Sequence, residues 1–194
     1  MIGGLTMTFL GRFFGLVMFA ALFASTNAAQ NAFPYKDQPL VKSFEKRALE
    51  YEKTRRKLES GLPRVSKQAT PEELTAFKLS LQKAIQANRS SSRQGEFFTP
   101  PIAERIRQMV KAEFKGWEAS ELRTKVLEAE TKGVPVKVNF PYPDSKELVD
   151  MPPTLLLSLP QLPKPLRYRF IGRNLVILDR DNALIIDYMP NALP

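Results

Sequence analysis

The chain has 194 residues, a formal net charge of +9, and neither histidine nor cysteine. Without these two residue types it lacks disulfide bonds, a thiol nucleophile, the usual general base at neutral pH and the commonest ligands of transition metals. A chain of this length allows one domain, or one domain with an extension.

The first segment, residues 1–28, is predicted to be a signal peptide. Arg12 precedes an uninterrupted apolar run of 12 residues, Phe13–Ala24, and small residues follow it, which is the order typical of an export signal. A membrane span needs roughly 20 apolar residues, so an uncleaved anchor is the weaker alternative. Met7 is an alternative start. We expect cleavage after Ala28 and a periplasmic or secreted protein with no stable membrane span.

The positive charge is unevenly distributed along the expected mature chain. Residues 30–133 carry 21 basic and 14 acidic side chains, whereas residues 134–194 carry 7 and 6. In an exported protein this excess favours an envelope protein or an anionic envelope surface as partner, over nucleic acid. Solvated helix faces are the simpler interpretation of the same charges. The pattern leaves the oligomeric state open.

A leader at residues 29–38, expected to be disordered, is followed by a predicted helical hairpin at residues 39–90. Apolar residues recur at helical spacing in both halves of the hairpin. Thr70 and Glu73 flank the start of the second helix as a capping box. The polar stretch that follows makes residues 91–98 the expected linker.

Residues 99–194 are expected to form an α+β module. Two helices, beginning near Thr99 and Glu118, are predicted to precede Val134–Phe140, whose alternating pattern makes it a candidate fourth edge strand. Pro152 then suits the start of a short helix, and the prolines after it favour an extended strap. The strap is expected to lay four leucines over a sheet: Leu155, Leu157, Leu159 and Leu162. A proline-rich ligand for a partner is the alternative.

Three runs rich in β-branched and aromatic residues predict a three-stranded antiparallel meander at the end of the chain. The runs are Arg167–Ile171, Leu175–Leu178 and Leu184–Tyr188. Gly, Asn and Asp residues between them suit hairpin connections. A sheet of this size is marginal alone, so the helices must cover it. The predicted fold is therefore α+β, with a signal helix, an α-helical hairpin and two helices packed on the small sheet.

The residues give little support to catalysis, and we expect a non-enzymatic protein with no cofactor and no metal. No phosphate-binding loop, dinucleotide fingerprint or nucleophile elbow occurs. The tightest carboxylate group is best explained as turn residues rather than a Ca²⁺ loop: Asp179, Asp181 and Asp187. The candidate contacts for an anion or a partner are Arg167, Arg169 and Arg173, although the solvated face of an edge strand explains them more simply.

Five short segments of the tail share an unusual mixture of proline, leucine and aromatic residues: Pro141–Pro143, Met151–Leu156, Leu159–Pro163, Tyr168–Arg173 and Ile185–Asp187. With them, the tail from Pro141 to Pro194 resembles a group of small exported bacterial proteins of unknown function, which implies this fold and export, but no activity. The meander is also distantly similar to the tail of the RcnB-type periplasmic proteins of nickel and cobalt homeostasis. Because the chain has no histidine, no metal-binding residue is carried over.

The leading hypothesis is therefore a periplasmic protein that binds or scaffolds another envelope component. A small-anion binder or a carboxylate-dependent enzyme is the first alternative. An accessory protein of periplasmic stress or ion homeostasis is the second, and it depends only on the distant similarity.

Overall fold

The computed structural model describes residues 37–115, 120, 124, 126–128, 135–143 and 150–193, which fold as α+β. The described residues belong to one compact unit. The predicted signal peptide and most of the predicted leader lie outside them, as does most of the helix expected from Glu118. The predicted fold class is confirmed.

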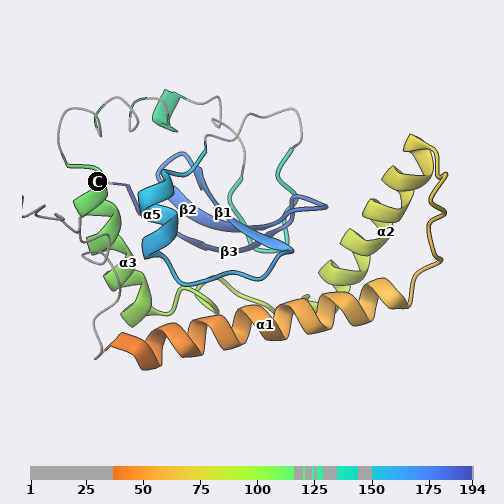
Figure 1. Ribbon diagram of the computed structural model, residues 1–194, viewed down its shortest axis with the longest axis horizontal. Coiled ribbons are helices and arrows are strands. Elements are labelled where there is room, and N and C mark those ends of the chain that lie inside the picture. The colour runs from red at the N-terminus through yellow and green to blue at the C-terminus, as the bar shows by residue number, and fades with distance from the viewer. Residues whose placement is uncertain are drawn as a thin grey trace, which may run out of the picture. The chain divides into compact units, whose positions relative to one another are not determined.

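Two helices form the expected hairpin (Figure 1). α1 spans Gln38–Ser60, so it begins inside the stretch expected to be a leader, and α2 spans Pro71–Asn88. The capping box before α2 is confirmed, since the Thr70 hydroxyl accepts from the Glu73 N–H at 3.2 Å and the Glu73 carboxylate accepts from the Thr70 N–H at 2.9 Å. These bonds satisfy two backbone donors that the first helical turn leaves unpaired.

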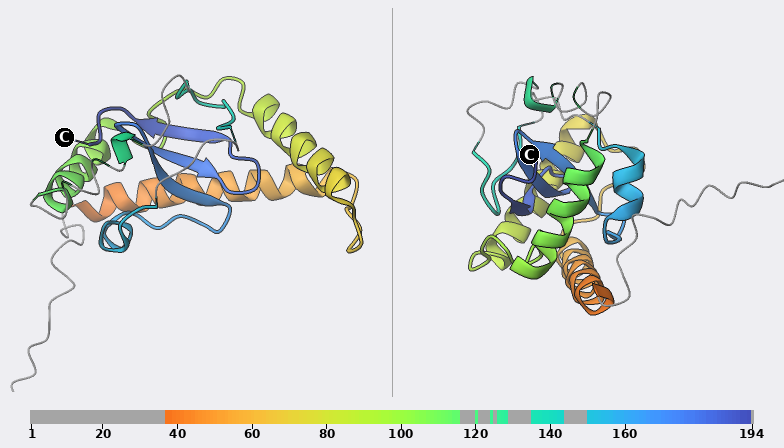
Figure 2. Two further views of the ribbon diagram at one scale, coloured as in Figure 1. Left: turned by 90° about the horizontal axis from the view of Figure 1, so that it is seen from above. Right: turned by 90° about the vertical axis from the view of Figure 1, so that its left-hand side faces the viewer.

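Two further helices pack on each other at one end of the sheet. α3 spans Pro100–Glu113 and α5 spans Pro153–Ser158, and both further views in Figure 2 keep them at that end. α3 buries a helical stripe of apolar residues: Ile102, Ala103, Ile106 and Val110. In α5 the helical period turns Leu155 inward and leaves Leu157 85% exposed. The expectation that Leu157 lies over the sheet is therefore wrong.

The three predicted strands form the predicted meander. β1 (Leu166–Ile171), β2 (Asn174–Asp179) and β3 (Ile185–Met189) pair antiparallel in the order β1-β2-β3. Residues 135–140 form no strand, because Asn139 has a φ of 62° and turns the chain. The expected fourth strand is reduced to a single bridge between Pro141 and Leu184.

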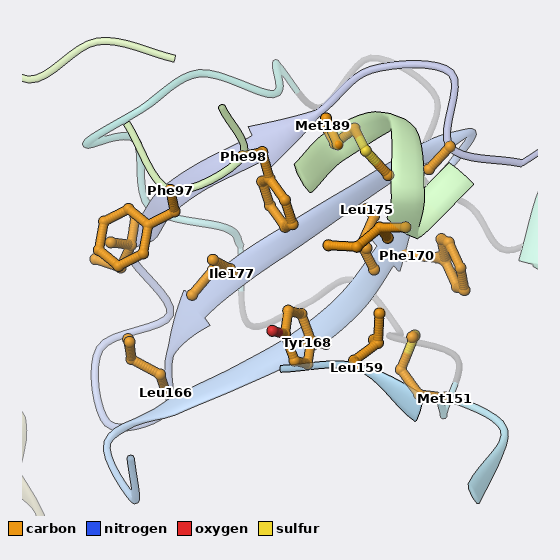
Figure 3. Close-up of a cluster of buried hydrophobic side chains, with 14 of the residues drawn as sticks. Phe97, Phe98, Met151, Leu159, Leu166, Tyr168, Phe170, Leu175, Ile177 and Met189 are labelled. Atoms are coloured by element: carbon orange, nitrogen blue, oxygen red, sulfur yellow. The ribbon is translucent and has the colours of Figure 1, made fainter. Parts of the chain in front are cut away.

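The helices cover one face of the sheet, and α1 runs alongside it (Figures 1 and 2). Strand residues on this face share a hydrophobic core with α1, α2 and α3, and Figure 3 shows several of them gathered on the sheet with Phe97 and Phe98. On the opposite face a smaller apolar cluster contains Ile171, Val176, Leu178, Ile185 and Tyr142. The sheet is therefore buried on both faces, as the continuous apolar run of β2 indicated.

The stretch expected to be a linker, residues 91–98, contributes two aromatic side chains to the core. Phe97 and Phe98 are 2% and 4% exposed. The Asp187 carboxylate holds this stretch by accepting the N–H groups of Gly95, Phe97 and Phe98 at 2.7–2.9 Å. The connection thus joins the hairpin and the C-terminal module into one core.

A buried ion pair fixes α1 to the sheet. Asp179, at the end of β2, is fully buried and accepts from the Tyr51 hydroxyl at 2.7 Å and from Arg55 Nε at 2.9 Å. Arg55 also pairs with Glu59 and Asp181. Burial lowers the pKa of Arg55, but the carboxylates of Asp179, Asp181 and Glu59 outweigh burial and raise it overall. Arg55 therefore stays charged inside the protein.

Candidate functional site

Two of the three arginines predicted as anion contacts lie together, and the third lies elsewhere. Arg167 and Arg169 alternate with the core residues of β1, so both project from the face opposite the helices. Arg173 lies in the turn after β1, where its guanidinium donates to the Leu193 carbonyl at 3.2 Å and its carbonyl accepts the Ala192 and Leu193 N–H groups. Arg173 therefore holds the C-terminal segment.

Arg180 takes the place beside Arg167 and Arg169 that the sequence suggested for Arg173. Burial lowers the pKa of Arg169, and the positive charges of Arg167 and Arg180 lower it further. Asp150 is the opposing charge, at 3.2 Å from Arg169, but its side chain is 93% exposed. A solvated carboxylate offsets little of this repulsion. Counting only the carboxylates that the structure describes, the three guanidinium groups thus form a positive cluster that Asp150 neutralises in part.

Two donors of the cluster are buried without an acceptor. The Nε atoms of Arg167 and Arg169 are inaccessible to solvent and have no hydrogen-bond partner among the residues that the structure describes. A buried donor without an acceptor costs about 1–3 kcal/mol. An anion placed between these side chains would supply both the missing acceptor and the missing charge.

The cluster lines a groove of about 350 Å³ between β1 and the segment that includes α5. The other wall is apolar and includes Leu156 and Leu157, which are 42% and 85% exposed. Leu159 and Leu162 continue it along the chain. We call this feature the arginine groove: Leu156–Leu162 on one side, and Arg167, Arg169 and Arg180 on the other. It combines an exposed aliphatic surface with concentrated positive charge.

The arginines also occupy backbone acceptors of β1, which is an edge strand of the sheet. Arg180 Nε donates to the Leu166 carbonyl at 3.1 Å, and Arg169 Nη1 donates to the Tyr168 carbonyl at 2.9 Å. Charged side chains at an edge oppose the addition of another strand. The groove is therefore suited to recognising side chains rather than to extending the sheet.

The carboxylates that sequence analysis grouped together have structural partners. Asp179 and Asp181 both pair with Arg55, and Asp187 accepts backbone N–H groups. Burial raises the pKa of Asp187, while the donated N–H groups act in the opposite direction. Asp181 lies beside Arg180 at the margin of the groove, but it is paired with Arg55. The side chains of the groove therefore favour anion binding.

Sequence reasoning missed Arg180 and Leu157 as groove residues. Arg180 lies in a turn, and only the β1–β2 register brings it beside Leu166, the partner of Asp179. Leu157 could have been recognised from the helical period within Pro153–Ser158, which separates it from Leu155.

Comparisons with protein-family models, curated proteins and solved structures found no match to this chain. Among the residues that the structure describes, no helix is both long enough and apolar enough to cross a membrane.

Proposed function

We propose that this chain is an exported, non-enzymatic protein that binds an acidic, partly apolar segment of another envelope protein in the arginine groove. The observation that carries the proposal is the convergence of three arginines, two with unpartnered buried donors, beside exposed leucines.

The chemistry of the groove defines the partner. Guanidinium groups bind carboxylates through paired, charge-assisted hydrogen bonds, which favours Glu or Asp side chains. Leu156 and Leu157 would be removed from water by aliphatic side chains of the same segment, which adds a favourable free energy of binding. A segment in which acidic and aliphatic residues alternate could pair with the arginines of one wall and pack against the leucines of the other.

Export belongs to the same proposal and depends on residues 1–28 of the sequence. Intact-mass measurement of the chain purified from the envelope fraction of a bacterial host tests it. The proposal requires a mature protein that begins at Ala29. A full-length mass, or recovery from the cytoplasm alone, contradicts export without affecting the groove.

The binding experiment uses fluorescence anisotropy of a labelled eight-residue peptide of alternating glutamate and leucine. We expect saturable binding to the purified chain, weakened by salt because the contacts are ionic. The double substitution Arg167→Gln and Arg169→Gln should weaken binding by about a hundredfold, since each charged hydrogen bond contributes roughly tenfold. Leu157→Ser should weaken it by about tenfold through lost apolar contact.

The matched control is the double substitution Lys42→Gln and Lys46→Gln on the exposed surface of α1, which removes the same charge. Equal losses in the control and the arginine variant would contradict a specific groove and indicate attraction by net charge. A peptide of alternating glutamate and serine tests the apolar wall, and unchanged affinity for it would contradict the role of the leucines. Binding only to anionic lipid vesicles would contradict a protein partner.

A further inference from the structure

A second cavity lies between α1, α2 and the stretch before α3. It has a volume of about 340 Å³, which is in the range of small-molecule sites. Its apolar lining includes Leu58, Ile85 and Phe97. Its charged lining comprises three arginines, Arg47, Arg55 and Arg89, and two carboxylates, Glu50 and Glu96. None of these residues belongs to the arginine groove.

The three arginines of this cavity differ in how fully they are engaged. Arg55 is bound by Asp179, Asp181 and Glu59, so it has little capacity for a ligand. Arg89 and Arg47 each bury an Nε atom that has no hydrogen-bond partner within the described ranges. In the part of the chain that the structure describes, no carboxylate pairs with Arg47. These two side chains therefore supply the donors that a ligand could use.

Arg89 is held in a fixed orientation. Its guanidinium carbon lies 5.6 Å from the ring centre of Tyr51 and 5.9 Å from that of Phe97, within the range of cation–π interactions. One terminal nitrogen donates to the Ile186 carbonyl at 2.9 Å and reaches Glu96 at 3.4 Å. A positioned guanidinium loses little conformational entropy when it binds an anion.

The geometry points to a binding site for a small organic carboxylate that carries an apolar group. The carboxylate would accept from Arg47 and Arg89, and the apolar group would lie against Leu58, Ile85 and Phe97. The free ligand could be a fatty or aromatic acid, or the C-terminal end of a peptide, since both present this chemistry. No bond is formed or broken at the site.

Isothermal titration calorimetry on the purified chain tests the site with matched probes. N-acetylphenylalanine and its amide differ in the carboxylate alone, and hexanoate represents an acid outside peptides. We expect saturable binding of at least one acid and at least tenfold weaker binding of the amide, because the amide lacks the charge that pairs with arginine. Preference between the two acids identifies the source of the ligand. Inorganic phosphate should bind at least tenfold more weakly than the better acid, since it cannot use the apolar wall.

The decisive variant is Arg47→Gln, which should weaken binding of the better acid by about tenfold. Because Arg47 has an unpartnered Nε and no carboxylate partner among the described residues, its removal should leave folding intact. Lys46→Gln is the control, since Lys46 is adjacent to Arg47, its side chain is 78% exposed, and it does not line the cavity, although its ion-pair partner Glu50 does. Absence of saturable acid binding at millimolar concentration overturns the inference, as does equal affinity in Arg47→Gln and the unmodified chain. Acid binding at this cavity does not depend on peptide binding at Arg167 and Arg169. Each proposal can therefore be contradicted without affecting the other.

Discussion

Arg167 illustrates at the residue scale how the proposed binding role conflicts with stability. Its Nε is buried without an acceptor, and its charge lies beside Arg169. Both features are unfavourable in the isolated protein, so the residue has no evident role in folding. Residues that bind ligands often carry this kind of cost.

We therefore predict that Arg167→Gln does not reduce the free energy of unfolding, and raises it by up to about 0.5 kcal/mol at low salt through reduced like-charge repulsion. Urea denaturation at low and high ionic strength measures this. A loss of more than about 1 kcal/mol would show that Arg167 stabilises the fold, and would argue against the arginine groove as a binding site.

Asp179 and Asp181 share Arg55 as partner but differ in burial, and this difference decides their effects on stability. Asp179 is fully buried, whereas the side chain of Asp181 is 56% exposed. Asp179→Asn should cost about 3 kcal/mol, because it leaves a buried guanidinium poorly compensated. Asp181→Asn should cost less than about 1 kcal/mol, as exposed ion pairs usually do. Similar losses for the two variants in urea denaturation would contradict the central position of Asp179.

Two tyrosines should resist ionisation at alkaline pH. Burial and then the Asp179 charge raise the pKa of Tyr51 well above its usual range, and burial raises that of Tyr168. Because the folded-state pKa exceeds the unfolded value of about 10, their contribution to stability is complete below that pH and declines above it.

Ultraviolet titration of phenolate absorbance should therefore detect fewer than the five tyrosines while the protein is folded. The remaining phenolates should appear only on unfolding. Tyr51→Phe should lower the unfolded total by one and leave the folded count unchanged. Ionisation of all five tyrosines in the folded protein would contradict the buried environments.

At the scale of single elements, α2 depends on its cap because few of its residues are buried. Only Leu81 and Ile85 lie fully in the core, and Leu74 is 46% exposed. We predict that Thr70→Ala costs about 1 kcal/mol, by removing an acceptor for the Glu73 N–H.

Thr75→Ala is the matched control for this cap. The Thr75 hydroxyl donates to the Pro71 carbonyl within the same helix, at 2.8 Å on an exposed face, so its loss should change stability by less than about 0.5 kcal/mol. Denaturation midpoints of the two variants measure the difference. Equal shifts of the midpoint in Thr70→Ala and Thr75→Ala would mean that the capping box makes no measurable contribution to stability.

The elements that could be predicted from sequence are those with strong local signals. The three strands combine β-branched residues with turn residues at Gly172 and at Asp181–Asn182, and α2 has a cap and a proline start. Val134–Phe140 has a strand pattern as well, but its described residues turn at Asn139 instead. Alternation alone does not distinguish a strand from a coil that packs on a sheet.

At the scale of the whole molecule, the features that sequence analysis could not predict join residues that are far apart in the chain. Arg55 meets Asp179 across 124 residues, and Phe98 meets Asp187 across 89. Neither contact can be recognised from a local sequence pattern, because charged and aromatic residues also occur at surface positions. The place of Arg180 in the arginine groove could not be predicted either, because the β1–β2 register, and not its neighbours in sequence, brings it there.

The residues that stabilise the fold differ from those of the two proposed binding sites. One core and a buried ion-pair network connect the helices to the sheet, while poorly neutralised arginines lie at two cavities on the surface of the protein. Under the proposed function, binding partners would supply the missing anions.

The most direct test of that account is amide chemical-shift mapping by NMR while the alternating glutamate–leucine peptide is added to the purified chain. The arginine groove predicts that the largest shifts fall on residues 156–169 and Arg180. Shifts scattered over the basic face of α1, or none at saturating peptide, would contradict the groove as the binding site.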